Sequence, residues 1–311
     1  YGDTSVLATV VESKIARDNI DFFPLMVEFE ERLYAAGIIK GSRWIKREGR
    51  PSDDAVLAGR MIDRSIRPLF SNTSRKDVQV IITVLSADQK NDHDIVSLIA
   101  ASAVLSVSGL EWNGPISGVR VSRVDGQFIF NPTYEERDKS DMDLVVAGTE
   151  HKVIMIEAGA REASEKSIFS AIAAGQKELQ TPIMLIKKLA ADVMPTKQTE
   201  KKEKLMDGEE INAEREKEKI FNDARAWLND NIKNILFDKT YYTKGERKAA
   251  ITAIKDGLNQ YLFEQGVGKD RRAQAIKNLV EPMAETEVTN AILKEKKRVD
   301  GRALNEIRAL I

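Results

Sequence analysis

The stretch at residues 42–70 reads S-R-W-I-K-R-E-G-R-P-S-D-D-A-V-L-A-G-R-M-I-D-R-S-I-R-P-L-F and holds the strongest local signals in the chain. Ser52 is a favoured helix N-cap residue. Asp53 and Asp54 follow it, where the positive end of a helix favours negative charge. Pro68 cannot continue a helix. These residues predict a helix that begins after Ser52 and ends before Pro68, with a turn at residues 49–51 in front of it.

This helix is expected to have an apolar face and a basic face. The residues at core-facing spacing are Val56, Leu57, Met61 and Ile62. Arg60, Arg64 and Arg67 recur at i, i+4 and i+7, so their guanidinium groups line another side of the helix.

The same stretch is locally basic, with seven Lys or Arg and four Asp or Glu between residues 43 and 67, in a chain of formal net charge -1. A basic row that follows the indole of Trp44 suits a polyanion with stackable bases, which is single-stranded nucleic acid. In the alternative interpretation the arginines pair with Asp54, Asp63 or other carboxylates on a solvated helix face. The spacing alone leaves both interpretations open.

The composition is that of a globular protein. The chain has 311 residues with 42% hydrophobic content, which is enough for about two domains. It has no cysteine, so disulfides and thiolate metal sites are excluded. The apolar runs are too short to span a bilayer and no signal-peptide pattern opens the chain, so we expect a cytoplasmic protein without membrane contact. Both ends look cut from a longer chain.

The first part of the chain mixes strands and helices. Strand-like runs lie at residues 5–11, 25–29, 77–86, 118–124, 127–130, 141–146 and 152–157, and helical patterns at residues 93–108 and 164–180. Asp125-Gly126 predicts a hairpin turn. The near-continuous apolar run at residues 77–86 indicates a strand buried on both faces. The order predicts an α+β domain, with helices packed on a mixed sheet.

The composition changes near residue 196. Residues 197–219 contain seven Lys or Arg and eight Asp or Glu, which predicts a mobile, charged connector over residues 196–210. Helical periodicity follows at residues 211–235, 244–265 and 269–297, and predicts a small all-helical domain.

Residues suited to catalysis or metal binding are few. His93 and His151 are far apart in the sequence and are interpreted as helix-terminus or surface residues. The best acidic candidates are Asp141, Asp143, Glu157 and Glu162. Asp141 and Asp143 alternate along a strand and could hold Mg²⁺. We favour the simpler interpretation, in which Asp141 lies in a turn and Asp143 pairs with an arginine.

Residues 42–70 closely resemble the segment of the polynucleotide phosphorylase family that carries a Phe-Phe-Arg-Arg loop and a Glu-Gly-Arg-Pro-Ser turn. Residues 21–37, 113–116 and 143–149 resemble the same family, so the match covers most of residues 2–186. Residues 299–308 resemble the opening of the family's second ribonuclease PH-like core. The resemblance implies a first ribonuclease PH-like domain with a truncated N-terminal strand at residues 1–195, the connector at 196–210, a helical domain at 211–297 and the start of a second core at 298–311.

The resemblance also implies an RNA-binding loop. The Phe-Phe-Arg-Arg motif falls on Trp44, Ile45, Lys46 and Arg47, and the following Arg50 matches the family directly. Only Trp44 keeps an aromatic ring, and Lys46 lacks the bidentate fork of arginine. With two arginines of the helix, the expected RNA-binding residues are Trp44, Ile45, Lys46, Arg47, Arg50, Arg60 and Arg64.

For the parent protein the resemblance implies a phosphate-dependent 3′→5′ exoribonuclease, a polyribonucleotide nucleotidyltransferase that releases nucleoside diphosphates in mRNA decay. It also implies a homotrimer, inorganic phosphate as substrate, Mg²⁺ held by the second core, and components of an RNA-degradation complex as partners. The catalytic and metal-binding residues belong to that second core, so we expect none in this chain and no activity from it alone. The alternatives are a non-catalytic RNA-binding assembly subunit of an exosome-like ring, and a structural adaptor using residues 211–297.

Overall fold

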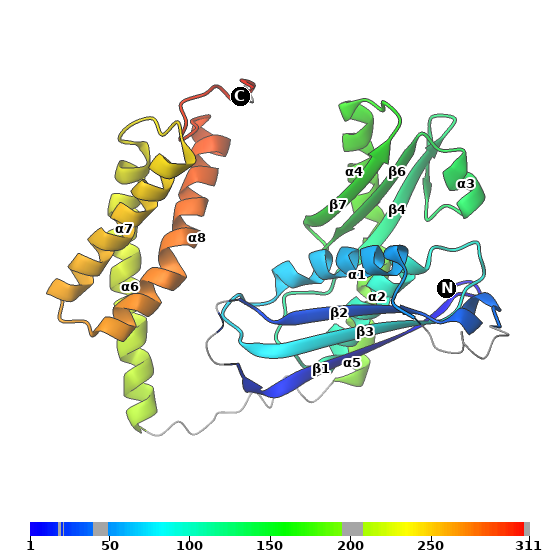
Figure 1. Ribbon diagram of the computed structural model, residues 1–311, viewed down its shortest axis with the longest axis horizontal. Coiled ribbons are helices and arrows are strands. Elements are labelled where there is room, and N and C mark those ends of the chain that lie inside the picture. Colours follow the sequence, from blue (N-terminus) through cyan, green and yellow to red (C-terminus); the bar gives the residue numbers. More distant parts are fainter. Residues whose placement is uncertain (18–19, 21, 40–48, 195–207, 308–311) are drawn as a thin grey trace. The chain divides into compact units, whose positions relative to one another are not determined.

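The computed structural model describes residues 1–17, 20, 22–39, 49–194 and 208–307, and of residues 208–214 only the backbone. The chain divides into two compact units, Tyr1–Lys201 and Lys202–Ile311. Figure 1 shows strands and helices in the first unit and helices in the second. The α+β class expected from the sequence is confirmed.

The first sheet of unit 1 contains three strands in the order β1–β3–β2 (Figure 1). Their bounds are Ser5–Ala16 for β1, Leu25–Glu31 for β2 and Lys76–Ser86 for β3. β1 runs antiparallel to β3, with Val10 opposite Val80, and β2 runs parallel to β3, with Phe29 opposite Ile82. The sheet is therefore mixed, as expected.

Burial on both faces was expected for β3 and is wrong. Val78, Val80, Ile82 and Val84 are buried, while the alternating residues are only half-buried or exposed. The opposite face of the sheet presents Leu7, Met26 and Leu85 to solvent, with 51%, 51% and 40% exposure. Within the described residues of unit 1, helices cover only one face of this sheet, so the central strand is half-buried despite its apolar sequence.

A second sheet is antiparallel and has the order β5–β4–β6–β7. Its strands are β4 (Ser117–Val124), β5 (Gln127–Phe130), β6 (Met142–Gly148) and β7 (Val153–Ala160). The predicted hairpin is confirmed, because Val124 pairs with Gln127 around Asp125 and Gly126. Both turn residues have positive φ, 50° and 78°, which suits this Asp-Gly pair.

Helices separate the two sheets and cover the second one. α1 (Asp53–Ile66) and α2 (His93–Ser108) share one core with the first sheet and with one face of β6. α4 (Glu165–Glu178) and α5 (Gln180–Val193) form another core against the opposite face of the second sheet. A Cβ at Gly175 of α4 would lie 3.2 Å from Val121 and Val146, so this glycine allows close packing. The short helix α3 spans Tyr134–Asp138, and two single 3-10 turns, η1 and η2, span Leu33–Ala36 and Arg67–Leu69.

The helix α5 was not expected from the sequence. The predicted single helix at residues 164–180 is followed in the structure by a second helix, which starts at Gln180 after the fully buried Leu179. Pro182 discourages the prediction of a continuing helix. However, a proline is tolerated in a first turn, where its missing N–H has no intrahelical partner to lose.

The described part of unit 2 contains three helices, α6 (Gly208–Phe237), α7 (Lys244–Glu264) and α8 (Lys269–Glu295). Their shared core includes Leu228, Ile254, Leu258 and Val280, each fully buried. This bundle matches the helical periodicity of the sequence. Among the helices that the structure describes, none combines the length and the apolar character needed to cross a membrane.

Candidate nucleic-acid interface

The helix α1 begins as its sequence predicts. Ser52 is the N-cap, and its Oγ accepts a hydrogen bond of 3.0 Å from the backbone N–H of Ala55. The same hydroxyl donates to Glu31 Oε2 at 2.8 Å, which attaches the start of α1 to the end of β2. Asp53 and Asp54 occupy the first turn. The cap therefore fixes where the basic face of α1 starts.

The apolar face of α1 differs from the expected one. Met61 and Ile62 are buried, but Val56 and Leu57 are 49% and 60% exposed, so their assignment to the core is wrong. Small residues occupy the side of α1 that faces the sheet: Ala55, Ala58 and Gly59 are buried, and a Cβ at Gly59 would be in ordinary contact with Phe29, at 3.5 Å.

The three arginines of α1 have different environments. Arg67 is held by Asp63 at 2.6 Å and donates to the carbonyls of Phe23 and Leu25 at 3.2 and 3.1 Å. Arg64 lies 3.4 Å from Glu157 of β7, and both side chains are more than half exposed. Such an exposed pair contributes little stability. The interpretation in which the arginines pair with carboxylates is therefore correct for Arg67. Arg64 also has a carboxylate partner, but that ion pair is long and exposed to solvent.

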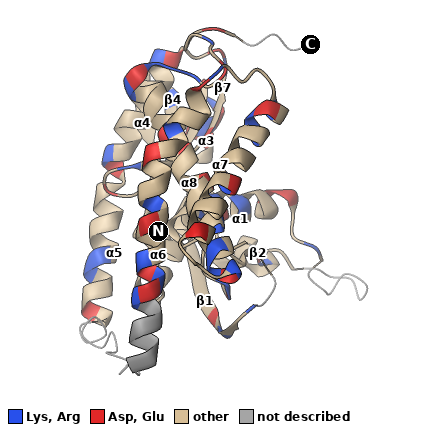
Figure 2. Ribbon diagram, turned by 90° about the vertical axis from the view of Figure 1, so that its left-hand side faces the viewer, with Lys and Arg blue, Asp and Glu red and all other residues tan. Residues whose placement is uncertain are grey.

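Arg60 and Arg50 are exposed and make no ion pair or hydrogen bond within the described residues. Arg50 lines a cleft of about 520 Å³ at the start of α1. Other residues that line this cleft are Glu31, Leu33, Pro51, Ser52 and His93. Trp44, Ile45, Lys46 and Arg47 lie outside the described residues. Figure 2 shows Lys and Arg interspersed with Asp and Glu along the helices, so a basic surface has to be local.

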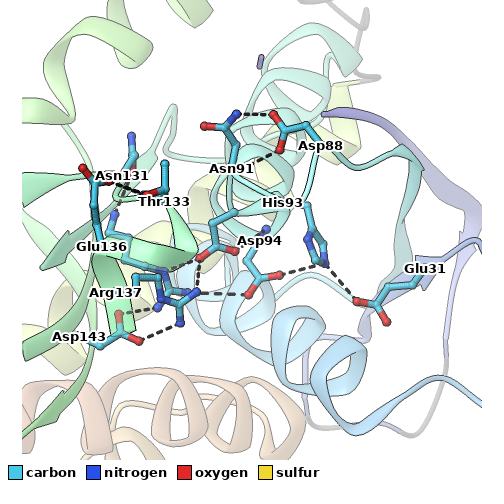
Figure 3. Close-up of polar contacts among 12 residues, drawn as sticks. Glu31, Asp88, Asn91, His93, Asp94, Asn131, Thr133, Glu136, Arg137 and Asp143 are labelled. Carbon is cyan, nitrogen blue, oxygen red and sulfur yellow. Dashed lines mark hydrogen bonds and ion pairs between the residues drawn. The ribbon is translucent and has the colours of Figure 1, made fainter. Parts of the chain in front are cut away.

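A buried ion network that the sequence analysis missed lies between the two sheets (Figure 3). Arg120 of β4 contacts Asp92 in an ion pair and donates to Asp143 Oδ1 at 2.7 Å. Arg137 of α3 contacts the same two acids, at 3.2 and 2.9 Å. The side chains of Arg120 and Asp92 are only 9% and 5% exposed. One available signal was Arg120 itself, a charged residue between Val119 and Val121 of β4.

His93, the first residue of α2, extends this network toward β2. Its Nε2 lies 3.1 Å from Glu31 Oε1 and 3.7 Å from Asp94 Oδ1, as Figure 3 shows. Arg120 Nη2 is 3.8 Å from Asp94. His151 is 82% exposed, 3.9 Å from Glu150. Both histidines thus occupy the helix-terminus and surface positions expected for them.

The acidic candidates are bound by arginines rather than gathered into one site. Asp141 pairs with Arg123, whose hydrogen bond lowers the pKa of Asp141. Burial raises the pKa of Asp143, but Arg120 and Arg137 outweigh it and the net shift is downward. Glu157 contacts Arg64, and Glu162 is exposed.

The described residues do not fit Mg²⁺. Asp92, His93 and Asp94 place one ligand atom each within 4.8 Å of one another. Guanidinium groups already contact both aspartates, and the histidine ring contacts Glu31. Mg²⁺ requires a near-octahedral set of oxygen ligands and usually keeps several waters. This cluster is therefore part of an arginine–carboxylate network.

Replacing Asp94 by asparagine is expected to change how the stability of unit 1 depends on pH. Burial, reinforced by Asp92, raises the pKa of Asp94 from 3.8 to about 6, although His93 and Arg120 act in the opposite direction. Folding therefore binds a proton between those two values, and stability falls as the pH rises through about 6. The free energy of unfolding of the variant, compared with that of the wild type, should therefore rise by up to about 3 kcal/mol between about pH 4 and pH 8.

Urea unfolding at a series of pH values measures this difference. Glu162→Gln, at an exposed site, is the control. A stability difference between Asp94→Asn and wild type that stays constant with pH would contradict the raised pKa.

Three family models match the chain in order. The 3' exoribonuclease family, domain 1, matches residues 1–111, and domain 2 of the same family matches residues 114–178. A third model, described as the RNA binding domain of polyribonucleotide nucleotidyltransferase, matches residues 217–303.

Curated relatives are similar over the whole chain. The polyribonucleotide nucleotidyltransferase of Heliobacterium modesticaldum is 41% identical over 311 residues, which are 100% of this chain and 41% of that protein. Those of Alkaliphilus oremlandii and Oceanobacillus iheyensis are 40% and 42% identical, again over 100% of this chain and 42% of each relative. The chain therefore spans about two fifths of the length of the curated relatives it matches.

Among solved structures, rice (Oryza sativa) Rrp46 is similar with a TM-score of 0.49 and 15% sequence identity, over 61% of this chain and 84% of that chain. The two 3' exoribonuclease models together span more than half of the chain, and relatives of one name match all of it at about 40% identity. The chain belongs to the polyribonucleotide nucleotidyltransferase family within the 3' exoribonucleases.

Proposed function

We propose that this chain is the RNA-binding, ring-forming N-terminal part of a phosphate-dependent 3′→5′ exoribonuclease. The observation that carries the proposal is the ordered match of the two 3' exoribonuclease models and the RNA binding model along one chain. In this reaction an oxygen of inorganic phosphate attacks the terminal phosphodiester phosphorus. The bond to the 3′ oxygen of the preceding nucleotide breaks, and a nucleoside diphosphate leaves. Such chemistry depends on positioning and charge neutralisation rather than on a protein nucleophile.

In this proposal the present chain contributes RNA binding, and catalysis belongs to a second core. Residues 1–195 form the first ribonuclease PH-like domain, residues 196–210 a connector, residues 211–297 the helical domain, and residues 298–311 the start of the second core. Mg²⁺ and the reacting phosphate are held by that core, consistent with the occupied carboxylates of this chain. The working assembly is a cytoplasmic homotrimer that joins an RNA-degradation complex.

RNA in this proposal contacts the loop before α1 and the exposed arginines of that helix. Trp44 stacks on a base, Ile45 adds apolar contact, and Lys46 and Arg47 neutralise phosphates together with Arg50, Arg60 and Arg64. The exposed and unpaired state of Arg50 and Arg60 supports this assignment. Arg64 must exchange its weak contact with Glu157 for a phosphate.

A phosphorolysis assay tests the proposed function. The 311-residue chain should bind single-stranded RNA but release no nucleoside diphosphate at any phosphate concentration. The full-length protein should release nucleoside diphosphates at a rate that rises with phosphate. A full-length protein that binds RNA without degrading it would be the non-catalytic assembly subunit instead, and absence of RNA binding by both would exclude either role.

A further inference from the structure

Both carboxylate oxygens of Glu31 have a polar partner. Glu31 is the last residue of β2, and its Oε2 accepts a hydrogen bond of 2.8 Å from Ser52 Oγ. Its Oε1 lies 3.1 Å from Nε2 of His93 (Figure 3). Ser52 is the N-cap of α1, and His93 is the first residue of α2. One side chain therefore ties the start of α1 to the end of β2 and to the start of α2.

The hydroxyl of Ser52 makes two separable hydrogen bonds. It accepts a hydrogen bond of 3.0 Å from the Ala55 N–H, which caps α1, and it donates its single hydrogen to Glu31. Loss of the Glu31 carboxylate leaves the cap in place, because the accepting oxygen of Ser52 is unchanged. Such a loss removes only the attachment of the helix start to β2.

The partners of Glu31 belong to packed elements. The His93 ring lies 5.8 Å from the ring of Phe29 on β2, and the His93 side chain is only 21% exposed. Phe29 is part of the core that α1 and α2 share with the first sheet. Groups held by strands and helices are positioned more precisely than groups on loops. Glu31 therefore offers Ser52 an acceptor at a fixed place.

A short, stiff connection leads from Ser52 to Arg50. The ring of the intervening Pro51 fixes its φ angle and also restricts the residue before it. Arg50 is exposed and makes no ion pair or hydrogen bond within the described residues. The cleft of about 520 Å³ at the start of α1 is lined by these three residues together with Glu31 and His93. Holding Ser52 therefore also holds the backbone that carries the Arg50 guanidinium at this cleft.

We propose that Glu31 is a positioning residue for RNA binding, because its carboxylate holds Ser52 and thereby places Arg50 where the guanidinium contacts a phosphate. The inference rests on the proposed function and adds a residue that does not itself touch RNA. A carboxylate repels a polyanion, so charge alone predicts that loss of Glu31 strengthens RNA binding. Anchoring predicts the opposite, because a group that is already in place loses less conformational freedom on binding.

Two substitutions of Glu31 separate its charge from its hydrogen bond. Glu31→Ala and Glu31→Gln both remove the negative charge, but the glutamine amide oxygen can still accept from Ser52. In the 311-residue chain, Glu31→Gln should bind a fluorescent oligouridylate at least as tightly as the wild type. Glu31→Ala should bind up to about fivefold more weakly than Glu31→Gln at about 0.1 M salt, with a salt slope smaller in magnitude by up to about 0.7, which corresponds to one phosphate contact.

Two further backgrounds test the route from Glu31 to RNA. In Arg50→Ala the difference between Glu31→Ala and Glu31→Gln should disappear, because the guanidinium that the anchor positions is gone. In Ser52→Ala the difference should disappear as well, because the hydrogen bond is already lost. A role of Glu31 in stability alone would lower RNA affinity equally with and without Arg50. Thermal melts check that every variant folds.

Glu12 of β1 provides a matched control in the same sheet. Its side chain is 31% exposed, against 35% for Glu31, and it accepts a hydrogen bond of 2.9 Å from Lys76. Glu12→Ala and Glu12→Gln remove the same kind of charge. These two variants should bind the oligouridylate equally, because the bond that they alter leads to no expected RNA-binding residue.

The results separate this inference from the function on which it rests. RNA binding by the wild type, with equal affinities for Glu31→Ala and Glu31→Gln, would overturn the inference alone. A difference between these variants that persists in the Arg50→Ala background would also overturn it, because Glu31 would then act by another route. Complete absence of RNA binding by the wild type would refute the proposed function together with the inference.

Discussion

Replacing Arg120 by alanine is expected to lower the free energy of unfolding of unit 1 by about 3–5 kcal/mol. Asp92 is 5% exposed and its carboxylate is compensated by Arg120 and Arg137. Without Arg120, one buried charge loses its closest partner, and Asp143 loses a hydrogen bond of 2.7 Å. The loss is large because a charge that cannot reach water has to be compensated inside the protein.

Unfolding in urea is monitored by the hydrogen exchange of the backbone amides in β4 and β6. This readout measures the loss of stability within unit 1. Arg123→Ala is the matched control, because Arg123 lies on the same strand and pairs with Asp141, whose side chain is 44% exposed. The control should cost no more than about 1 kcal/mol. If both variants lose the same free energy of unfolding, burial of the Arg120 ion pairs does not make them more stabilising than the exposed pair of Arg123.

Removing Arg50, Arg60 and Arg64 together is expected to weaken single-stranded RNA binding by about tenfold to a hundredfold at moderate salt. Each RNA phosphate that loses its arginine keeps its condensed counterion on binding, so the slope of log affinity against log salt should fall in magnitude by about 2. All three side chains are exposed, and among the residues that the structure describes only Arg64 of these arginines has an ion-pair partner, at 3.4 Å and in solvent. The triple substitution should therefore leave unit 1 folded.

The control removes three exposed lysines of α4 and α5 on the other side of the second sheet, Lys166, Lys177 and Lys188. This variant has the same net charge as the arginine variant, so a difference in RNA affinity reports position rather than total charge. Fluorescence anisotropy at several salt concentrations gives both quantities. Equal affinities for the two triple variants would mean that the α1 surface does not contact RNA.

Features specified by adjacent residues could be predicted from the sequence. The N-cap at Ser52 and the hairpin turn at Asp125 and Gly126 depend on hydrogen bonds and dihedral angles within a few residues. The helical periodicity of unit 2 likewise repeats along each helix. These local rules were enough for the α+β class, for the helical bundle and for the position of the basic face on α1.

Burial could not be predicted in the same way. Val56 and Leu57 have the same apolar character as Met61 and Ile62, yet only the second pair is buried. The buried side of α1 also contains the small residues Ala55, Ala58 and Gly59, which a search for large apolar residues does not single out. β3 has the sequence of a fully buried strand, but helices of this chain cover one of its faces. Burial depends on which elements pack together, and those elements are distant in the sequence.

By itself the sequence determined the fold class and the family, and it supplied the residues that we predict to contact RNA, because these follow from local pattern and from motifs in order. Only the tertiary structure decided which arginines remain available. Arg67 is held by carbonyls of residues 23 and 25, and Arg120 is held by the N-cap aspartate of α2 and by an aspartate of β6, whereas Arg60 is exposed to solvent. The physical reason is that the partner of a charge is chosen by distance in space, and folding sets that distance.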